Sequence, residues 1–133
     1  MADAIVADPS TDTNGRVYYW RTRWEAEMRA ASIYLLTRNE EVTTNYALKL
    51  QDFMDAKVPK ELWHRDSTAA WLAATWRLLK KEGAATPLIQ AHRAALKLAE
   101  PNNWDWGYYY YNSKLTREAT AFTIVCRHFP DIA

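Results

Sequence analysis

The sequence predicts an all-α protein, a single-domain antiparallel helical bundle of four long helices, with one more short helix as an open alternative. Four segments place apolar residues at intervals of three and four, the period of an amphipathic helix. The 133 residues include only three glycines and five prolines, too few for a loop-rich β protein. The connections between the segments are short, and no internal repeat of helical hairpins is evident.

The composition limits the classes of protein to consider. Hydrophobic residues make up 49% and charged residues 25%, as in ordinary soluble domains. Seven Trp and eight Tyr give the chain large rings, which let a small domain bury much apolar area. Cys126 is the single cysteine, so no intramolecular disulfide and no cysteine-based zinc site is possible.

Charge and hydropathy divide the chain into a flexible leader at residues 1–15 and a helical domain at residues 16–133. The leader holds three Asp and no Lys or Arg, and it lacks the basic start of a secretory signal. No apolar run reaches the roughly 20 residues of a membrane span, so we expect a cytoplasmic protein without membrane contact. The net charge of +1 permits an acidic partner without requiring one.

The first predicted helix runs from Arg16 to about Arg38. Arg21, Glu25 and Arg29 form a ladder of opposite charges four residues apart on one face. On another face, steps of three and four residues predict an apolar seam toward the core, made of Val17, Trp20, Trp24, Met28, Ala31 and Leu35.

The second helix is predicted to follow at once. Asn39 suits a cap, and Glu40 and Glu41 suit an acidic first turn. The helix would continue to about Ala56, because the proline of Val58-Pro59 excludes a helical residue before it. Residues 60–65 could form the additional short helix.

Caps and breakers define the third and fourth helices. Asp66-Ser67 reads as an N-cap and Gly83 as the glycine that follows a helix end. Thr86-Pro87 then reads as a cap with proline in the first turn, and Glu100-Pro101 ends the helix. The apolar face of the fourth helix consists of Leu88, Ala91, His92, Ala95, Leu98 and Ala99.

The last segment contains six rings in eight residues, Trp-Asp-Trp-Gly-Tyr-Tyr-Tyr-Tyr, at positions 104–111. These rings are in phase with the helix that follows, so one helix from about residue 103 to 128 is favoured. Gly107 and a second cap at Asn112-Ser113 argue against continuity, and a tyrosine-rich strand is the alternative. The predicted seam comprises Trp104, Tyr108, Tyr111, Leu115, Ala119, Phe122 and Cys126.

Three rings of this run point away from the seam. Trp106, Tyr109 and Tyr110 face other sides of the same helix, and a small bundle cannot bury every side of one helix. Either a neighbouring segment covers them, or they form an interface for a protein partner, since Trp and Tyr dominate interface energetics. They are therefore the candidate protein-binding residues.

Catalytic, cofactor and metal motifs are not found. The chain has no HExxH, no GxSxG and no phosphate-binding glycine loop, so we expect no metal or cofactor, and an enzyme is not supported. An aromatic-lined pocket in the bundle is a further hypothesis. Its candidate residues are His92, Glu118, Trp104 and Tyr108, although a hydrogen-bonded structural role is the simpler interpretation of His92.

Nucleic-acid binding is a third hypothesis. Arg16, Arg21, Arg23 and Arg29 alternate with aromatic residues, a mixture that suits contacts to phosphates and stacked bases. The simpler interpretation has the rings in the core and the arginines paired with nearby glutamates, so this class is not favoured.

The prediction for function is a small helical binding protein of the inhibitor, immunity or accessory type. Its expected partner is another protein or a second copy of this chain.

Overall fold

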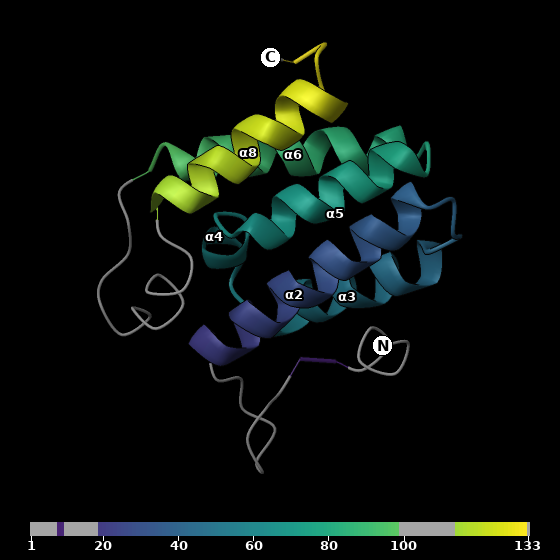
Figure 1. The fold of residues 1–133 in the computed structure, drawn as a ribbon. Helices are drawn as coiled ribbons and strands as arrows, with labels where there is room; N and C mark the ends of the chain where they lie inside the picture. Colours follow the sequence, from purple (N-terminus) through teal and green to yellow (C-terminus); the bar gives the residue numbers. More distant parts are fainter. Residues whose placement is uncertain (1–7, 10–18, 99–113, 133) are drawn as a thin grey trace.

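The computed structural model describes residues 8–9, 19–98 and 114–132, and this part of the chain contains six helices and no strand (Figure 1). The predicted all-α class is therefore confirmed. In chain order the helices are α2 (Tyr19–Arg38), α3 (Thr44–Lys57), α4 (Lys60–Trp63), α5 (Ser67–Leu78), α6 (Glu82–Leu96) and α8 (Lys114–His128).

Helix α5 is the centre of the molecule. It packs against α6, α2 and α8, and Figure 1 shows α2 and α3 on one side of it and α6 and α8 on the other. Four of its alanines, Ala69, Ala70, Ala73 and Ala74, have no exposed surface. Small side chains let neighbouring helices approach closely, which explains why α5 can be covered on several sides at once.

The directions of the helices differ from those of an up-and-down bundle. In Figure 1, α2, α5 and α8 run in the same general direction, and α3 and α6 run back. Two of the helices that pack against α5, α2 and α8, are therefore parallel to it, whereas α6 is antiparallel. The antiparallel four-helix bundle that the sequence predicts is thus not confirmed.

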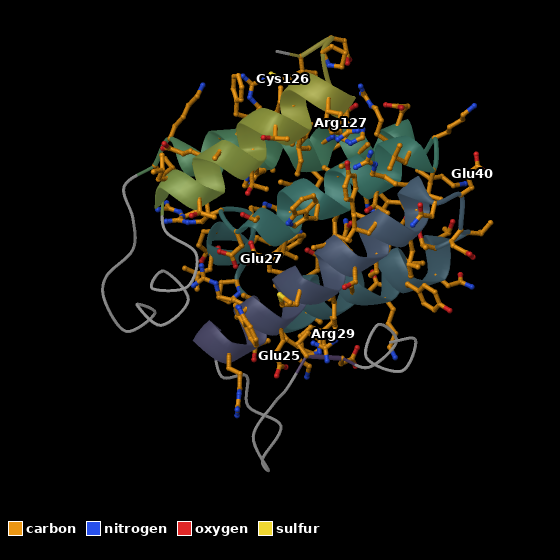
Figure 2. All side chains as sticks on the ribbon, in the orientation of Figure 1. Glu25, Glu27, Arg29, Glu40, Cys126 and Arg127 are labelled. Atoms are coloured by element: carbon orange, nitrogen blue, oxygen red, sulfur yellow. The ribbon has the colours of Figure 1, made fainter. Side chains whose placement is uncertain are left out.

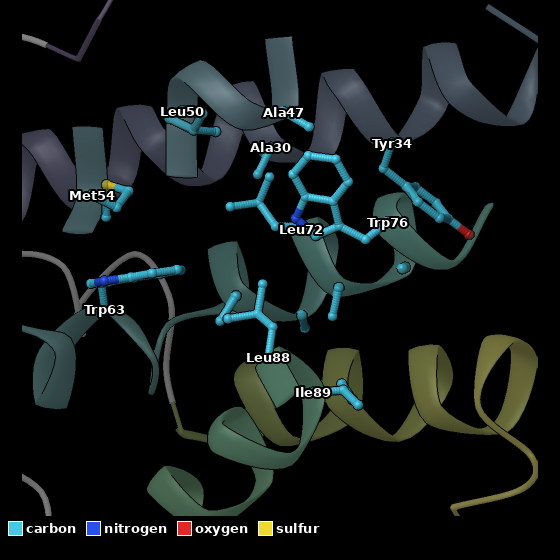
Figure 3. Close-up of a cluster of buried hydrophobic side chains, with 14 of the residues drawn as sticks. Ala30, Tyr34, Ala47, Leu50, Met54, Trp63, Leu72, Trp76, Leu88 and Ile89 are labelled. Atoms are coloured by element: carbon cyan, nitrogen blue, oxygen red, sulfur yellow. The ribbon is translucent and has the colours of Figure 1, made fainter. Parts of the chain in front are cut away.

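The core lies between α5 and the helices around it (Figure 3). Trp63 of α4 is completely buried, and Met54 of α3 and Leu72 of α5 are equally inaccessible. Trp76 is also buried, and its indole Nε1 donates a 2.6 Å hydrogen bond to Oε1 of Gln51 on α3. Burial of these large side chains is the main source of stability in such a domain.

Helices α2 and α5 end in the same backbone motif, in which the amide three residues beyond the last helical residue bonds back to the carbonyl five residues before it. Glu41 N–H donates to Leu36 at 3.1 Å, and Lys81 N–H donates to Trp76 at 2.8 Å. Each motif needs a left-handed residue, and Glu40 (φ 67°) and Lys80 (φ 61°) take this role without glycine.

These helix ends correct two predicted boundaries. Asn39, Glu40 and Glu41 complete the end of α2 instead of starting α3, which begins at Thr44. Gly83 lies inside α6, because Lys80 already provides the left-handed residue that the sequence assigned to the glycine. Pro87 is consequently an internal residue of α6 and not its first one.

The predicted seam of the first helix does not face α5. Of its members, Trp24, Met28 and Leu35 are 39%, 53% and 56% exposed. The buried side of α2 is instead made of Thr22, Arg23, Ala26, Ala30, Ile33, Tyr34 and Thr37. Several of these are small or polar, and they suit close packing against the alanines of α5.

The predicted seam of the last helix is wrong in its described part, from Leu115 to Cys126, while Trp104, Tyr108 and Tyr111 lie outside the described residues. Leu115 is 77% and Phe122 72% exposed, and Ala119 is also exposed. Cys126, predicted as a buried hydrophobe, is an exposed free thiol. The buried side of α8 consists of Arg117, Ala121, Ile124, Val125 and Phe129 just beyond the helix end.

None of the helices in the described segments is long and apolar enough to cross a membrane.

Candidate binding face

An apolar surface follows the outer side of α8. It consists of Leu115, Ala119, Phe122 and Cys126, and we call it the α8 face. Steps of four, three and four residues place these side chains in one line along the helix. All four are exposed, and Figure 2 shows Cys126 on α8 near its C-terminal end. Exposed apolar side chains in a continuous line are characteristic of interaction sites rather than of ordinary surface.

A groove of about 370 Å³ runs between α8 and α6 beside this face. Phe122, Cys126 and Glu118 contribute to its α8 wall, and Arg93 and Lys97 to its α6 wall. Most of the remaining lining is apolar. The groove therefore combines an apolar floor with two cations on one wall and a carboxylate on the other.

A second groove of about 370 Å³ lies on the opposite side of the α8 face. Leu115 and Ala119 line it together with Trp71 of α5 and three threonines of α8, Thr116, Thr120 and Thr123. The α8 face is thus a ridge between a charged groove and an uncharged one. A partner could cover such a ridge with one helix or with two segments packed side by side.

The C-terminal end of α8 is held by arginines from α5 and α6. The Arg77 guanidinium donates to the carbonyl of His128 at 3.0 Å and to the carboxylate of Asp131 at 2.7 Å, and it lies 4.1 Å from the centre of the Phe129 ring. Arg93 donates to the carbonyl of Ile132 at 3.0 Å. These contacts fix the orientation of α8, and hence which side of it faces outward.

A buried cluster of charges lies near the N-terminal ends of α2 and α5. Arg23 of α2 and Asp66, which precedes α5, form an ion pair with both side chains completely buried. The Nε of Arg23 donates to Oδ2 of Asp66 at 2.7 Å. Burial raises the pKa of Asp66, while the charges of Arg23, Arg117 and Arg65 oppose this rise.

His92 is a structural residue of α6. Its side chain is completely buried, and Nδ1–H donates a 2.7 Å hydrogen bond to the backbone carbonyl of His64. Burial lowers the pKa of His92 to about 4, so the ring is neutral at pH 7. His92 does not line the groove that contains Glu118, so the structure does not bring these two predicted pocket residues together.

The other predicted site residues are either outside the described part of the chain or on α2. Trp104, Trp106, Tyr108, Tyr109, Tyr110 and Arg16 are outside the described residues. Of the remaining arginines, Arg21 is exposed, Arg29 lies 3.7 Å from Glu25, and Arg23 is buried with Asp66. Figure 2 shows the neighbouring positions of Glu25 and Arg29 on α2. Arg23 is thus not available on the surface for a nucleic acid.

The sequence pattern alone does not distinguish the α8 face from a core seam. Its spacing is visible in the sequence and predicts a core position, because an apolar line on a helix usually faces inward. The cations beside it, Arg93 and Lys97, carry no motif and are brought to α8 only by the packing of α6.

Metal binding has no support in the described segments, where no three His, Cys, Asp or Glu side chains are grouped to hold an ion.

The chain is similar in sequence to alpha-2-macroglobulins. The sequence is 35% identical over 102 residues to an alpha-2-macroglobulin of Pasteurella multocida and 33% identical over 108 residues to an alpha-2-macroglobulin homolog of Yersinia pestis. These alignments cover 77% and 81% of this chain but only 5% of either relative. An alpha-2-macroglobulin of Rickettsia conorii is 26% identical over 98% of this chain and 7% of its own. No family model and no solved structure matches.

Proposed function

We propose that this chain is a helical protein-binding domain that contacts its partner through the α8 face. The observation that carries the proposal is the exposure of Leu115 and Phe122, at 77% and 72%, on one line of a helix whose opposite side is in the core. Burying both side chains at an interface would contribute roughly 1.5–3 kcal/mol each. An apolar line of this kind favours association with another polypeptide.

The similarity to alpha-2-macroglobulins supports a protein partner. The chain spans about 5% of the length of the relatives in Pasteurella multocida and Yersinia pestis, so it corresponds to a small part of those proteins. Because alpha-2-macroglobulins are protease inhibitors, a protease is the first external partner to test. In that case the chain acts as an inhibitor or as an accessory factor of one.

The test is a binding comparison between the wild type and a Phe122→Glu variant, which places a charge in the middle of the α8 face. Leu48→Glu is the matched control, because Leu48 is an exposed apolar residue (49%) on α3, away from this face. Proteins from the source cell that bind the immobilised wild type are purified and titrated against all three forms by calorimetry.

We expect the wild type and Leu48→Glu to bind the purified partner with similar affinity and Phe122→Glu to bind at least tenfold more weakly. Equal binding by Phe122→Glu would show that the α8 face is not the binding surface. Circular dichroism of each variant confirms that a loss of binding does not come from unfolding.

A further inference from the structure

We propose that a second copy of this chain occupies the α8 face, with the two α8 helices antiparallel about a twofold axis. The inference rests on the proposed function and names the partner of that face. The axis would pass between Ala119 and Phe122, the middle of the four-residue line.

The sizes of the side chains along the α8 face favour the antiparallel arrangement. In this register Leu115 lies opposite Cys126 of the second copy, and Ala119 lies opposite Phe122 of the second copy. Each large side chain therefore meets a small one at every one of the four levels. A twofold interface must be complementary to itself, and the α8 face fulfils this condition in the antiparallel arrangement. In a parallel arrangement each Phe122 would meet the Phe122 of the second copy, and each Ala119 would meet the other Ala119. The helices would then have too much side-chain volume at one level and unfilled space at the next.

The spacing of the side chains along the α8 face also favours a paired helix. Steps of four, three and four residues are the pattern by which one helix packs against another in a coiled coil. The buried side of α8, which includes Arg117, Ile124 and Phe129, lies on the far side of the helix from this line. A second helix can therefore dock without disturbing the contacts that α8 makes to α5.

The charges beside the α8 face also favour the antiparallel pair. Glu118 and Val125 both line the groove between α8 and α6, together with Arg93 and Lys97. The twofold register puts Glu118 of the second copy near the level of Val125, on this same side. Its carboxylate then approaches Arg93 and Lys97 of the first copy. By symmetry, Glu118 of the first copy approaches Arg93 and Lys97 of the second copy. On the other side the helices present the uncharged side chains of Thr116 and Thr123.

The size of the contact predicts a weak dimer. One helix face and its flanking groove form a small contact in comparison with stable interfaces, which bury roughly 1,200 Å² or more. Association is therefore expected only at high protein concentration, and sedimentation equilibrium into the millimolar range is the suitable measurement. Phe122→Glu should remain monomeric over the same range, while Leu48→Glu should associate like the wild type.

Disulfide trapping tests the register. Cys126 and Cys126 of the second copy would be 11 residues apart along the paired helices, about 16 Å, which is beyond the reach of a disulfide. The wild type should therefore form no covalent dimer under mild oxidation. Leu115→Cys should form one efficiently, because each new thiol lies opposite Cys126 of the second copy. Leu115→Cys combined with Cys126→Ser should form none.

Three results would overturn the inference. The first is a wild type that stays monomeric at the highest concentration. The second is a covalent dimer of the wild type through Cys126, which indicates a parallel pair. The third is an equal yield of covalent dimer from Leu115→Cys with and without Cys126→Ser. If the wild type is monomeric but Phe122→Glu loses an external partner, only this inference fails. If Phe122→Glu changes neither association nor partner binding, the proposed function fails as well.

Discussion

Arg23 and Asp66 are 43 residues apart in the sequence and form a completely buried ion pair between α2 and the start of α5. Asp66 occupies the N-cap position of α5, but its side chain makes no capping hydrogen bond to the helix. Its carboxylate is used to join two helices instead. The charges of Arg65 and Arg117 also act on it, so a residue from α8 belongs to the same cluster.

Replacing Asp66 by Asn should destabilise the protein by about 3–5 kcal/mol, because it leaves buried arginine charge without its carboxylate. Urea denaturation of the wild type and Asp66→Asn measures the change. The double variant Arg23→Met, Asp66→Asn should lose less than the sum of the two single variants, since the two residues are directly coupled. Strict additivity of the two losses would contradict a direct pairing.

Acidification should destabilise the protein through His92. The pKa of His92 is about 4 in the folded protein, against 6.5 for the free side chain, so protons bind more tightly to the unfolded chain. The contribution to stability is complete above pH 6.5 and is lost as the pH falls from 6.5 toward 4, in total on the order of 3 kcal/mol.

His92→Asn is the control for this pH dependence, because its amide can still donate a hydrogen bond to the carbonyl of His64. We expect the variant to be less stable at pH 7 but to lose less free energy of unfolding between pH 7 and 4.5. An identical loss in both proteins would assign the acid sensitivity to other groups. His64 and His128, whose pKa values burial also lowers, are present in both proteins and cancel in the comparison.

Truncation of two phenylalanines that lie seven residues apart at the end of α8 should change the stability of the protein to very different extents. Phe129 has no exposed surface, so Phe129→Ala should cost about 3–5 kcal/mol. Phe122 is 72% exposed, so Phe122→Ala should change stability by less than about 0.5 kcal/mol. Thermal unfolding at low protein concentration is the measurement. A large loss for Phe122→Ala would mean that this side chain is covered within the monomer.

Arg77→Gln should loosen the C-terminal end of the chain. The substitution removes the ion pairs to Asp131 and Glu82 and the charge above the Phe129 ring. Asp131 and Glu82 are exposed, so we expect a modest loss of about 1–2 kcal/mol.

The location of this effect is more informative than its size. Hydrogen exchange of the amides at Phe129 and Ile132 should become faster, because both amides bond to carbonyls of the segment that Arg77 holds. Exchange in α3 should not change. Uniformly faster exchange over the whole chain would indicate a global loss of stability instead of a local release.

The helical class and most helix positions were predictable from the sequence, and the short helix α4 was one of its alternatives, since these features depend on local spacing, prolines and helix formers. The ion ladder of Glu25 and Arg29 and the end of the last helix at His128 were likewise predictable. The helix ends at Glu40 and Lys80 were not, because tertiary packing imposed left-handed residues where no glycine marks them.

Which side of α2 and of α8 is buried depends on tertiary packing. Each of these helices has an apolar line on one side and a second side that mixes apolar and polar residues, and local periodicity favours the apolar line as the core. The mixed sides pack against α5, whose buried alanines allow neighbouring helices to approach closely. The line of Leu115, Ala119, Phe122 and Cys126 was therefore visible in the sequence, but its role as a surface followed from what α5 left uncovered.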